Sequence, residues 1–271
     1  MIRERNFSMD CSDLRSKTLF LLDMDGTVYL GDRPIDGAVD FIRSLRRRGC
    51  EYVFLTNNSS RSAESYLEKL HRLGFEAQKE NLFTSGQASA RFLQRKKPGA
   101  KVYCVGTRSL CAELRHYGLC VTDAPDADTD FLLVGYDTEL TYAKLTDACD
   151  LLCRDVPFYA TNPDRVCPAG NGRYLPDCLT MCAMLTEATG KKPYYIGKPR
   201  AAFAEEALRE KNRTASEAVL VGDRLYTDIQ CGINAGITSV LVLSGESTRQ
   251  DVDTTGIRPD VIVNSVKDLI F

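Results

Sequence analysis

The sequence has no apolar run approaching the about 20 residues that a membrane-spanning helix needs. Its first 17 residues are charged and lack the apolar segment of a secretory signal peptide; they carry no other readable signal. Charge of one sign is also lacking, since 35 basic residues oppose 37 acidic ones and leave a net charge of −2. We therefore expect neither a membrane nor a nucleic acid as a partner.

The sequence also lacks a Cys-x-x-Cys pair, although it contains 11 cysteines. A zinc site built on such pairs is therefore not expected. Several cysteines lie within apolar segments, where a free thiol behaves as a small hydrophobic side chain. We expect reduced thiols, a cytoplasmic location and core positions for Cys104, Cys149, Cys153, Cys182 and Cys231.

Short apolar strands alternate with helical segments along the whole chain. The strands are continuously apolar, as expected for a parallel sheet that helices cover on both faces. Breaks near 96–99 and 190–193 contain Lys, Pro and Gly, which are typical of linkers. The sequence predicts an α/β fold with a mostly parallel sheet. Its core domain is discontinuous, and a second domain is inserted between the two breaks.

Two carboxylates follow the apolar strand expected at 19–23. The strand runs into Asp23-Met24-Asp25-Gly26-Thr27. A carboxylate at the end of a buried strand is costly unless a cation or hydrogen bonds compensate its charge. Asp and Gly are also ordinary turn residues, so this segment alone allows a plain polar turn.

Three further strands of the expected core end in polar residues. The strand at 52–56 ends in Thr56-Asn57-Asn58, and the strand at 194–196 precedes Gly197-Lys198. The strand at 218–221 runs into Gly222-Asp223, followed by Asp228. Because the carboxyl ends of parallel strands share one edge of a sheet, we expect these side chains to converge on one crevice.

Such a set suits phosphoryl transfer to a carboxylate. Asp23 would attack phosphorus, and Asp25 would protonate the departing alcohol and later accept a proton from water. Thr56 and Lys198 would hold the phosphoryl oxygens, with Asn57 and Asn58 adding to the substrate-binding loop.

A Mg²⁺ ion would reduce the repulsion between the anionic nucleophile and the anionic phosphate. Its expected ligands are Asp23, Asp223 and a main-chain carbonyl. Asp228 would orient Lys198 or the waters around the metal.

The four segments 23–27, 55–58, 196–199 and 222–228 resemble the four motifs of the haloacid dehalogenase superfamily. The similarity is greatest to its NagD-like, p-nitrophenyl phosphatase branch, and it includes Ala160-Thr161-Asn162-Pro163-Asp164. The resemblance implies Asp23 as the nucleophile, Asp25 as the acid/base, and Mg²⁺ on Asp23, Asp223 and the main-chain carbonyl of Asp25.

The resemblance also implies a Rossmann-like, doubly wound parallel-sheet core formed by 1–90 and 193–271. A large α/β cap is inserted at 91–192, between the second and third motifs. The stretch from Asp23 to Thr56 is too short for a cap, whereas the stretch from Thr56 to Lys198 is long enough. Asp137 would then lie in the cap, without a catalytic role. A homodimer through the caps is expected, and the candidate specificity residues are Asn162, Asp164, Arg165, Asn171, Arg173 and Asp177.

The sequence therefore predicts a Mg²⁺-dependent phosphatase of small phosphorylated metabolites, such as sugar phosphates or nucleotides, that would also hydrolyse p-nitrophenyl phosphate in vitro. Carbon–halogen hydrolysis on the same fold does not need an acid at the second Asp, so Asp25 argues against that reaction. Mutases tend to carry a smaller cap elsewhere, so the spacing of the motifs argues against a mutase. The alternative that remains is a phospho-ligand sensor that binds without turnover.

Overall fold

A computed structural model describes residues 11–168 and 173–270, which form two compact units. The first unit contains the described residues up to Leu55, then Leu67–Leu82 and the residues from Pro199 onward. The second unit contains Thr56–Tyr66 and Phe83–Lys198. The chain thus changes unit at 55/56, 66/67, 82/83 and 198/199, whereas the sequence placed the changes at 90/91 and 192/193.

A six-stranded sheet forms the centre of the first unit, in the order β15-β14-β13-β1-β4-β5. The pairs β15–β14, β14–β13, β13–β1 and β1–β4 are all parallel. The strands are β1 (Leu19–Asp23), β4 (Glu51–Thr56), β5 (Leu82–Thr84), β13 (Ala218–Gly222), β14 (Thr238–Val242) and β15 (Val261–Val263).

The central strand β1 is buried because its side chains are apolar on both faces. Leu19 to Leu22 are all 0% exposed. In the register, Leu22 pairs with Val221 of β13, and Asp23 pairs with Leu55 of β4. The carboxyl ends of these three strands therefore lie at the same edge of the sheet.

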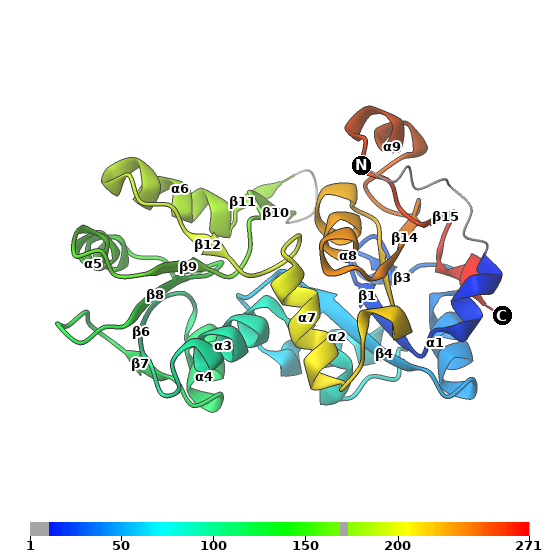
Figure 1. Cartoon of the computed structure of the whole chain (residues 1–271), viewed down its shortest axis with the longest axis horizontal. Coiled ribbons are helices and arrows are strands. Elements are labelled where there is room, and N and C mark those ends of the chain that lie inside the picture. Colours follow the sequence, from blue (N-terminus) through cyan, green and yellow to red (C-terminus); the bar gives the residue numbers. More distant parts are fainter. Residues whose placement is uncertain (1–10, 169–172, 271) are drawn as a thin grey trace. The chain divides into compact units, whose positions relative to one another are not determined.

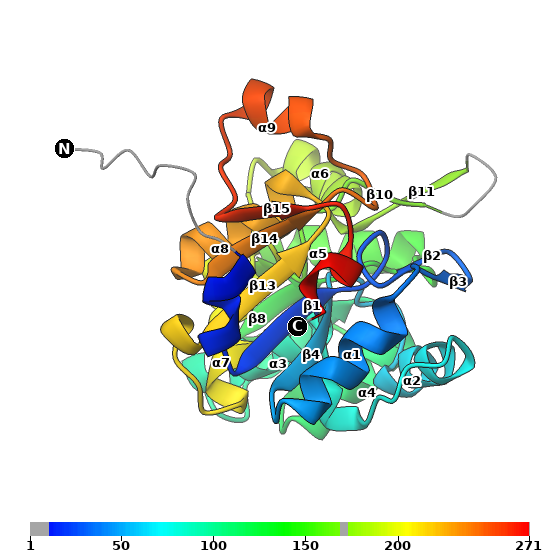
Figure 2. The ribbon, with the colours of Figure 1, turned by 90° about the vertical axis from the view of Figure 1, so that its right-hand side faces the viewer.

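Helices cover this sheet on both faces. Figure 2 shows α7 and α8 on one side of the strands and α1 and α2 on the other. A single turn of π-helix, η4, leads directly into α8. The helical segments are η1 (Cys11–Ser16), α1 (Ala38–Arg47), α2 (Ala63–Arg72), η2 (Lys79–Asn81), α7 (Ala201–Glu210), η3 (Ala215–Glu217), η4 (Leu225–Ile229), α8 (Gln230–Ala235), α9 (Arg249–Thr255) and η5 (Val266–Leu269).

The second unit contains a five-stranded sheet in the order β12-β9-β8-β6-β7, and every pair in it is parallel. Figure 1 shows α5 and α6 on one face of this sheet and α3 and α4 on the other. The elements are α3 (Ser85–Lys96), β6 (Lys101–Val105), α4 (Arg108–His116), β7 (Cys120–Thr122), β8 (Phe131–Val134), α5 (Tyr142–Cys153), β9 (Phe158–Ala160), α6 (Cys178–Thr189) and β12 (Tyr194–Tyr195).

Alternate residues of β6 face two separate cores of this unit. Tyr103 and Val105 pack in one cluster with residues of α5 and α6. Val102 and Cys104 pack in another cluster with residues of α3 and α4. The alternation of side chains along a strand therefore makes this sheet the middle of three layers.

The structure confirms the α/β fold, with parallel sheets between helices. It corrects the position of the strand before Lys198: β12 pairs with β9 in the second unit, and not with the sheet of the first unit. This strand has only two residues, so its apolar pattern carried no information about its neighbour. Several further elements were not predicted from the sequence: β5, β7, α9 and the two hairpins β2 (Tyr29–Leu30) with β3 (Arg33–Pro34) and β10 (Val166–Pro168) with β11 (Tyr174–Pro176).

Two of the cysteine predictions are wrong. Cys104, Cys182 and Cys231 are buried, but Cys149 is only partly buried and Cys153 is exposed. Both lie on α5, whose buried residues are Ala148, Leu151 and Leu152.

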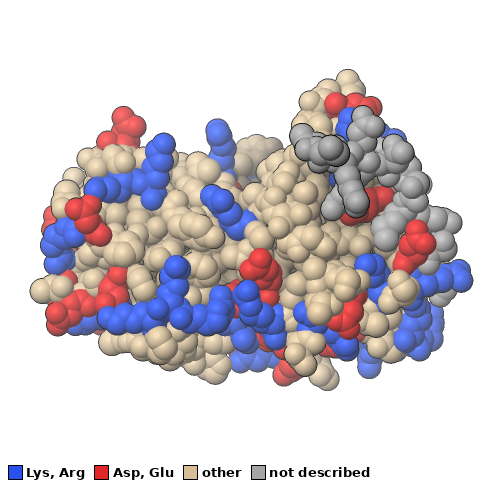
Figure 3. All heavy atoms as spheres, viewed as in Figure 1, with Lys and Arg blue, Asp and Glu red and all other residues tan. Residues whose placement is uncertain are grey.

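The described helices include none that is long and apolar enough to cross a membrane. Figure 3 shows basic and acidic side chains mixed over the displayed face. This agrees with the even charge balance of the sequence.

Asp137 has a structural ion pair in the second unit. Its side chain is 0% exposed, and its Oδ2 lies 2.7 Å from Nζ of Lys144. Lys144→Met would leave a buried carboxylate without its cation, so we expect the free energy of unfolding to fall by about 3–5 kcal/mol in urea denaturation. Lys267→Met, which removes the exposed pair with Asp36, should leave the midpoint unchanged. Equal shifts for the two variants would contradict a structural role for the buried pair.

Candidate active site

Three carboxylates converge at the carboxyl edge of the first unit's sheet. Asp23 is the last residue of β1, Asp223 directly follows β13, and Asp228 lies in η4. One oxygen from each lies within 4.8 Å of the other two. Asp223 and Asp228 are 2% and 0% exposed. Three anions this close, two of them buried, require positive charge or hydrogen-bond donors nearby.

The turn after β1 is a tight loop that brings main chain against Asp223. The carbonyl oxygen of Met24 accepts hydrogen bonds from the N–H groups of Thr27, Val28 and Tyr29, at 2.9–3.2 Å. Gly26 has a φ of +87°, and a Cβ at this position would lie 2.4 Å from Oδ2 of Asp223. The glycine of the first motif is therefore required both by its backbone conformation and by the carboxylate beside it.

A loop after β14, which was not predicted from the sequence, completes the surroundings of Asp223. The side-chain Oδ2 of Asp223 accepts a hydrogen bond from the N–H of Glu246 at 2.7 Å. The main-chain carbonyl of Asp223 accepts one from the N–H of Ser247 at 3.0 Å. Ser244 Oγ donates to the carbonyl of Gly26 at 2.8 Å. The polar run after another strand of the same sheet was the available signal for this loop.

Arg224 places a cation among these acids, and this role was not predicted from the sequence. Its Nε lies 2.8 Å from Oε2 of Glu246, whose Oε1 accepts a hydrogen bond from the Tyr226 hydroxyl at 2.7 Å. Burial acts to lower the pKa of the guanidinium, but the carboxylates of Asp23 and Glu246 raise it, and the net pKa lies above its usual range. Arg224 therefore stays charged and offsets part of the negative charge.

Asp25 differs from the cluster because it is exposed on the surface of its unit. Partial desolvation by the surrounding protein raises the pKa of its carboxyl above the usual value, while the Lys69 ammonium and a hydrogen bond from the backbone of Gly31 act in the opposite direction. A carboxyl with a raised pKa is more readily protonated, as a general acid must be. Lys69 lies 4.0 Å from the centre of the Tyr29 ring.

The remaining predicted site residues lie in the second unit. Thr56 ends β4, and its Oγ1 accepts a hydrogen bond from the N–H of Asn58 at 3.1 Å. Lys198 and Asn57 are 3% and 7% exposed. The N–H of Lys198 donates to Oδ1 of Asn57 at 2.9 Å, so these two residues contact each other directly. The structure therefore brings together Asp23, Asp223 and Asp228 in one unit, and Asn57 and Lys198 in the other.

Two of the candidate specificity residues form structural hydrogen bonds at the start of α6. Asp177 caps the N-terminus of α6, accepting the N–H of Cys178 at 2.6 Å, and Asn162 donates to its Oδ1 at 3.2 Å. Both are buried. Asp164 accepts a hydrogen bond from Asn57, Arg165 and Arg173 are exposed, and Asn171 lies outside the described residues.

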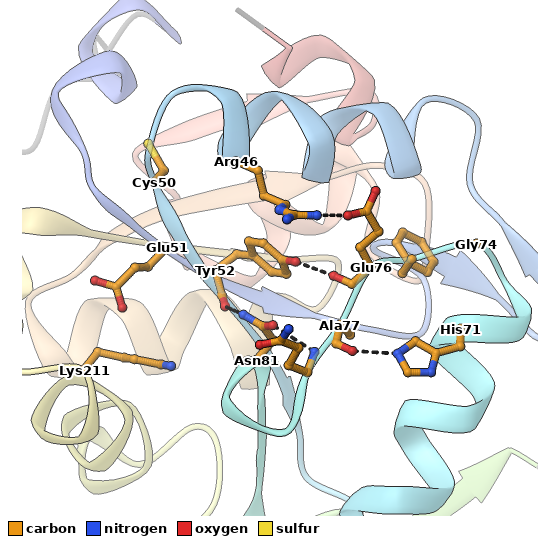
Figure 4. Close-up of a pocket in the computed structure, with 12 residues that line it drawn as sticks. Arg46, Cys50, Glu51, Tyr52, His71, Gly74, Glu76, Ala77, Asn81 and Lys211 are labelled. Atoms are coloured by element: carbon orange, nitrogen blue, oxygen red, sulfur yellow. Dashed lines mark hydrogen bonds and ion pairs between the residues drawn. The ribbon is translucent and has the colours of Figure 1, made fainter.

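A pocket of about 790 Å³ lies in the first unit, away from the carboxylates Asp23, Asp223 and Asp228 (Figure 4). It sits at the amino end of β4, opposite the edge where the carboxylates converge. Its polar groups bond mainly to one another: Arg46 pairs with Glu76, and His71 contacts the carbonyl of Ala77 at 2.6 Å. The pocket therefore does not belong to the candidate active site.

The donor set of the carboxylate cluster fits a hard divalent cation. Asp23, Asp223 and Asp228 offer only oxygen ligands, which Mg²⁺ and Ca²⁺ prefer over softer metals. A divalent cation would also offset the repulsion between the three anions.

Comparison with known proteins gives two matches to family models. A model described as haloacid dehalogenase-like hydrolase matches residues 20–120, and a second model of HAD-like hydrolases matches residues 195–269. Among curated relatives, the 5'-nucleotidase YutF of Bacillus subtilis is 34% identical, covering 93% of this chain and 96% of its own. The acid sugar phosphatase of Staphylococcus aureus is 36% identical, covering 92% and 94%.

Solved structures are similar over nearly the whole chain. The 4-nitrophenylphosphatase of Thermotoga maritima gives a TM-score of 0.88 at 35% identity, covering 95% of this chain and 98% of its own. The glycerol phosphate phosphatase of Mycobacterium tuberculosis, in complex with magnesium, gives 0.87 at 34% identity, covering 95% and 77%. These findings confirm the resemblance to the haloacid dehalogenase superfamily and its p-nitrophenyl phosphatase branch, and they support a divalent metal.

Gly245 tests the metal site without removing a ligand. A Cβ on Gly245 would lie 2.1 Å from Oδ2 of Asp223, so Gly245→Ala must displace that carboxylate. We expect this variant to bind Mg²⁺ about 10- to 100-fold more weakly in isothermal titration calorimetry.

The matched control is Gly232→Ala on α8, where the nearest atom to the added Cβ is Ser239 Cβ at 3.1 Å. It should bind Mg²⁺ as the wild type does. Unchanged affinity in a folded Gly245→Ala variant would contradict the assignment of Asp223 as a metal ligand.

Proposed function

Since the chain belongs to the haloacid dehalogenase-like hydrolases and is a phosphatase, we propose that it hydrolyses small phosphomonoesters through an aspartyl-phosphate on Asp23. The main observation behind this mechanism is that Asp23, Asp223 and Asp228 converge at the carboxyl edge of the sheet. The exposed Asp25 follows Asp23 by two positions in the chain.

The reaction takes two steps on the residues of this chain. In the first, an oxygen of Asp23 attacks phosphorus, the bond from phosphorus to the ester oxygen breaks, and Asp25 donates its proton to the departing alcohol. In the second, water attacks the phosphoryl group on Asp23 and gives a proton to Asp25. Inorganic phosphate leaves, and Asp23 is again a carboxylate.

We assign the metal to Mg²⁺, held by the side chains of Asp23 and Asp223 and by the main-chain carbonyl of Asp25. When bound, the ion supplies positive charge that reduces repulsion between the nucleophile and the phosphate. Asp228 accepts the N–H of Arg224 at 3.1 Å, which fixes the chain next to Asp223. We propose that Asp228 orients Lys198 or the waters around the ion.

Thr56 and Lys198 are the phosphate-binding groups in this proposal. Thr56 donates its hydroxyl, and Lys198 its ammonium, to the phosphoryl oxygens, with Asn57 and Asn58 forming the rest of the loop. We propose that residues 91–192, which form the greater part of the second unit, are the cap expected from the sequence. The cap then selects among small phosphorylated metabolites such as sugar phosphates and nucleotides.

The relatives described above are named as phosphatases and a nucleotidase, so they support turnover over a phospho-ligand sensor. The homodimer through the caps stays a prediction. Sedimentation that finds only the 30.2 kDa chain would contradict it.

The proposal is tested by phosphate release from sugar phosphates, nucleotides, polyol phosphates and p-nitrophenyl phosphate. We expect release with Mg²⁺, loss of release with EDTA, and no release by Asp23→Asn, because an amide oxygen is a poor nucleophile. Release by Asp23→Asn at the wild-type rate would reject the mechanism.

Asp25→Asn tests the acid/base separately. An amide cannot donate the proton, so kcat should fall by about 10²- to 10⁴-fold for substrates with a poor leaving group. Asp32→Asn removes another acid whose charge acts on Asp25, and it should keep most of the activity. Similar losses in the two variants would mean that only the local charge matters.

A further inference from the structure

The side chain of Asn57 binds both main-chain polar groups of Lys198. Its Oδ1 accepts the N–H of Lys198 at 2.9 Å, and its Nδ2 donates to the carbonyl of Lys198 at 3.0 Å. The same Nδ2 donates to Oδ1 of Asp164 at 3.2 Å. All three residues belong to the second unit.

These bonds use the hydrogen-bond donors of the Asn57 side chain completely. A carboxamide carries two N–H donors, and here one is directed to Lys198 and the other to Asp164. No donor of this side chain remains for a phosphoryl oxygen. The sequence placed Asn57 on the substrate, but the contacts of its carboxamide are with Lys198 and Asp164.

The chain around this contact is built for close approach. Gly197 donates its N–H to the carbonyl of Thr161 at 2.8 Å. A Cβ on Gly197 would lie 2.5 Å from that carbonyl oxygen and 2.8 Å from Oδ1 of Asn57. Ser85 Oγ in turn donates to the carbonyl of Asn57 at 2.5 Å, which fixes the other side of the contact.

We propose that Asn57 is a positioning residue, which holds the backbone of Lys198 so that its ammonium meets the transferred phosphoryl group. This inference rests on the proposed function of Lys198 as a phosphate-binding cation. The bond to Asp164 also connects the segment 160–164 to Asn57. A lysine side chain has many rotamers, so its ammonium can occupy many positions. Fixing the backbone of Lys198 reduces the number of positions that the ammonium can reach.

The test is a double-mutant cycle of Asn57→Ala and Lys198→Ala. It is read by kcat and KM for p-nitrophenyl phosphate and by calorimetric affinity for inorganic phosphate, both with Mg²⁺. We expect Asn57→Ala alone to lower kcat on the order of 10²-fold, as misplacement of a catalytic group does. In the Lys198→Ala background the same substitution should cost less than about threefold, because its effect passes through the lysine.

If Asn57→Ala lowered kcat in the Lys198→Ala background by as large a factor as it does in the wild type, the proposal would be overturned, since Asn57 would then act independently of the lysine. Asn264→Ala, on an exposed asparagine, is the matched control and should behave as the wild type. If Asn57→Ala does not fold in a thermal melt, Asn57→Asp runs the same cycle, because it keeps the acceptor and removes both donors.

The affinity for inorganic phosphate separates this inference from the proposed function. A wild type that binds phosphate without turnover would reject the hydrolytic mechanism, while the affinity cycle would still decide the role of Asn57. Non-additive losses of affinity would support it, and additive losses would overturn it. A wild type that neither binds nor releases phosphate would reject both.

Discussion

Mutual repulsion among three carboxylates is the constraint around which the first unit is arranged. Asp23, Asp223 and Asp228 place oxygens within 4.8 Å of one another, and two of the side chains are buried. Two kinds of group in the surrounding chain stabilise these negative charges. Backbone N–H groups point at the carboxylates, as from Glu246 to Asp223, and the Arg224 guanidinium remains nearby. A divalent cation would supply the rest.

Glycines make this concentration of charge sterically possible. Gly26 and Gly245 come so close to the Asp223 carboxylate that any Cβ would collide with it, and Gly222 stands in the same relation to Asp228. The parallel sheet brings the carriers of the acids to one edge, and the glycines let backbone close around them. The site is thus a product of strand register and of missing side chains as much as of the acids themselves.

The sequence predicted the parts of the fold that depend on local pattern. The apolar segment 19–22 followed by two acids predicted β1 with its correct bounds, and the acids of the first and fourth motifs were predicted to meet. The sequence did not predict the sheet to which β12 belongs, because two residues carry no register information. Nor did it predict Arg224, whose role depends on Glu246 from a later loop, or the capping role of Asp177, which looks like a loop acid until α6 is seen to begin there.

The proposed mechanism requires Asp23 to carry the phosphoryl group during turnover. The most direct measurement is to quench the enzyme with acid during hydrolysis of p-nitrophenyl phosphate and to map its peptides by mass spectrometry. We expect one phosphoryl group on the peptide that contains Asp23, located on that residue, and its disappearance once the substrate is exhausted. Turnover with no phosphoryl group on Asp23 at any time, or with the group on another residue, would contradict it.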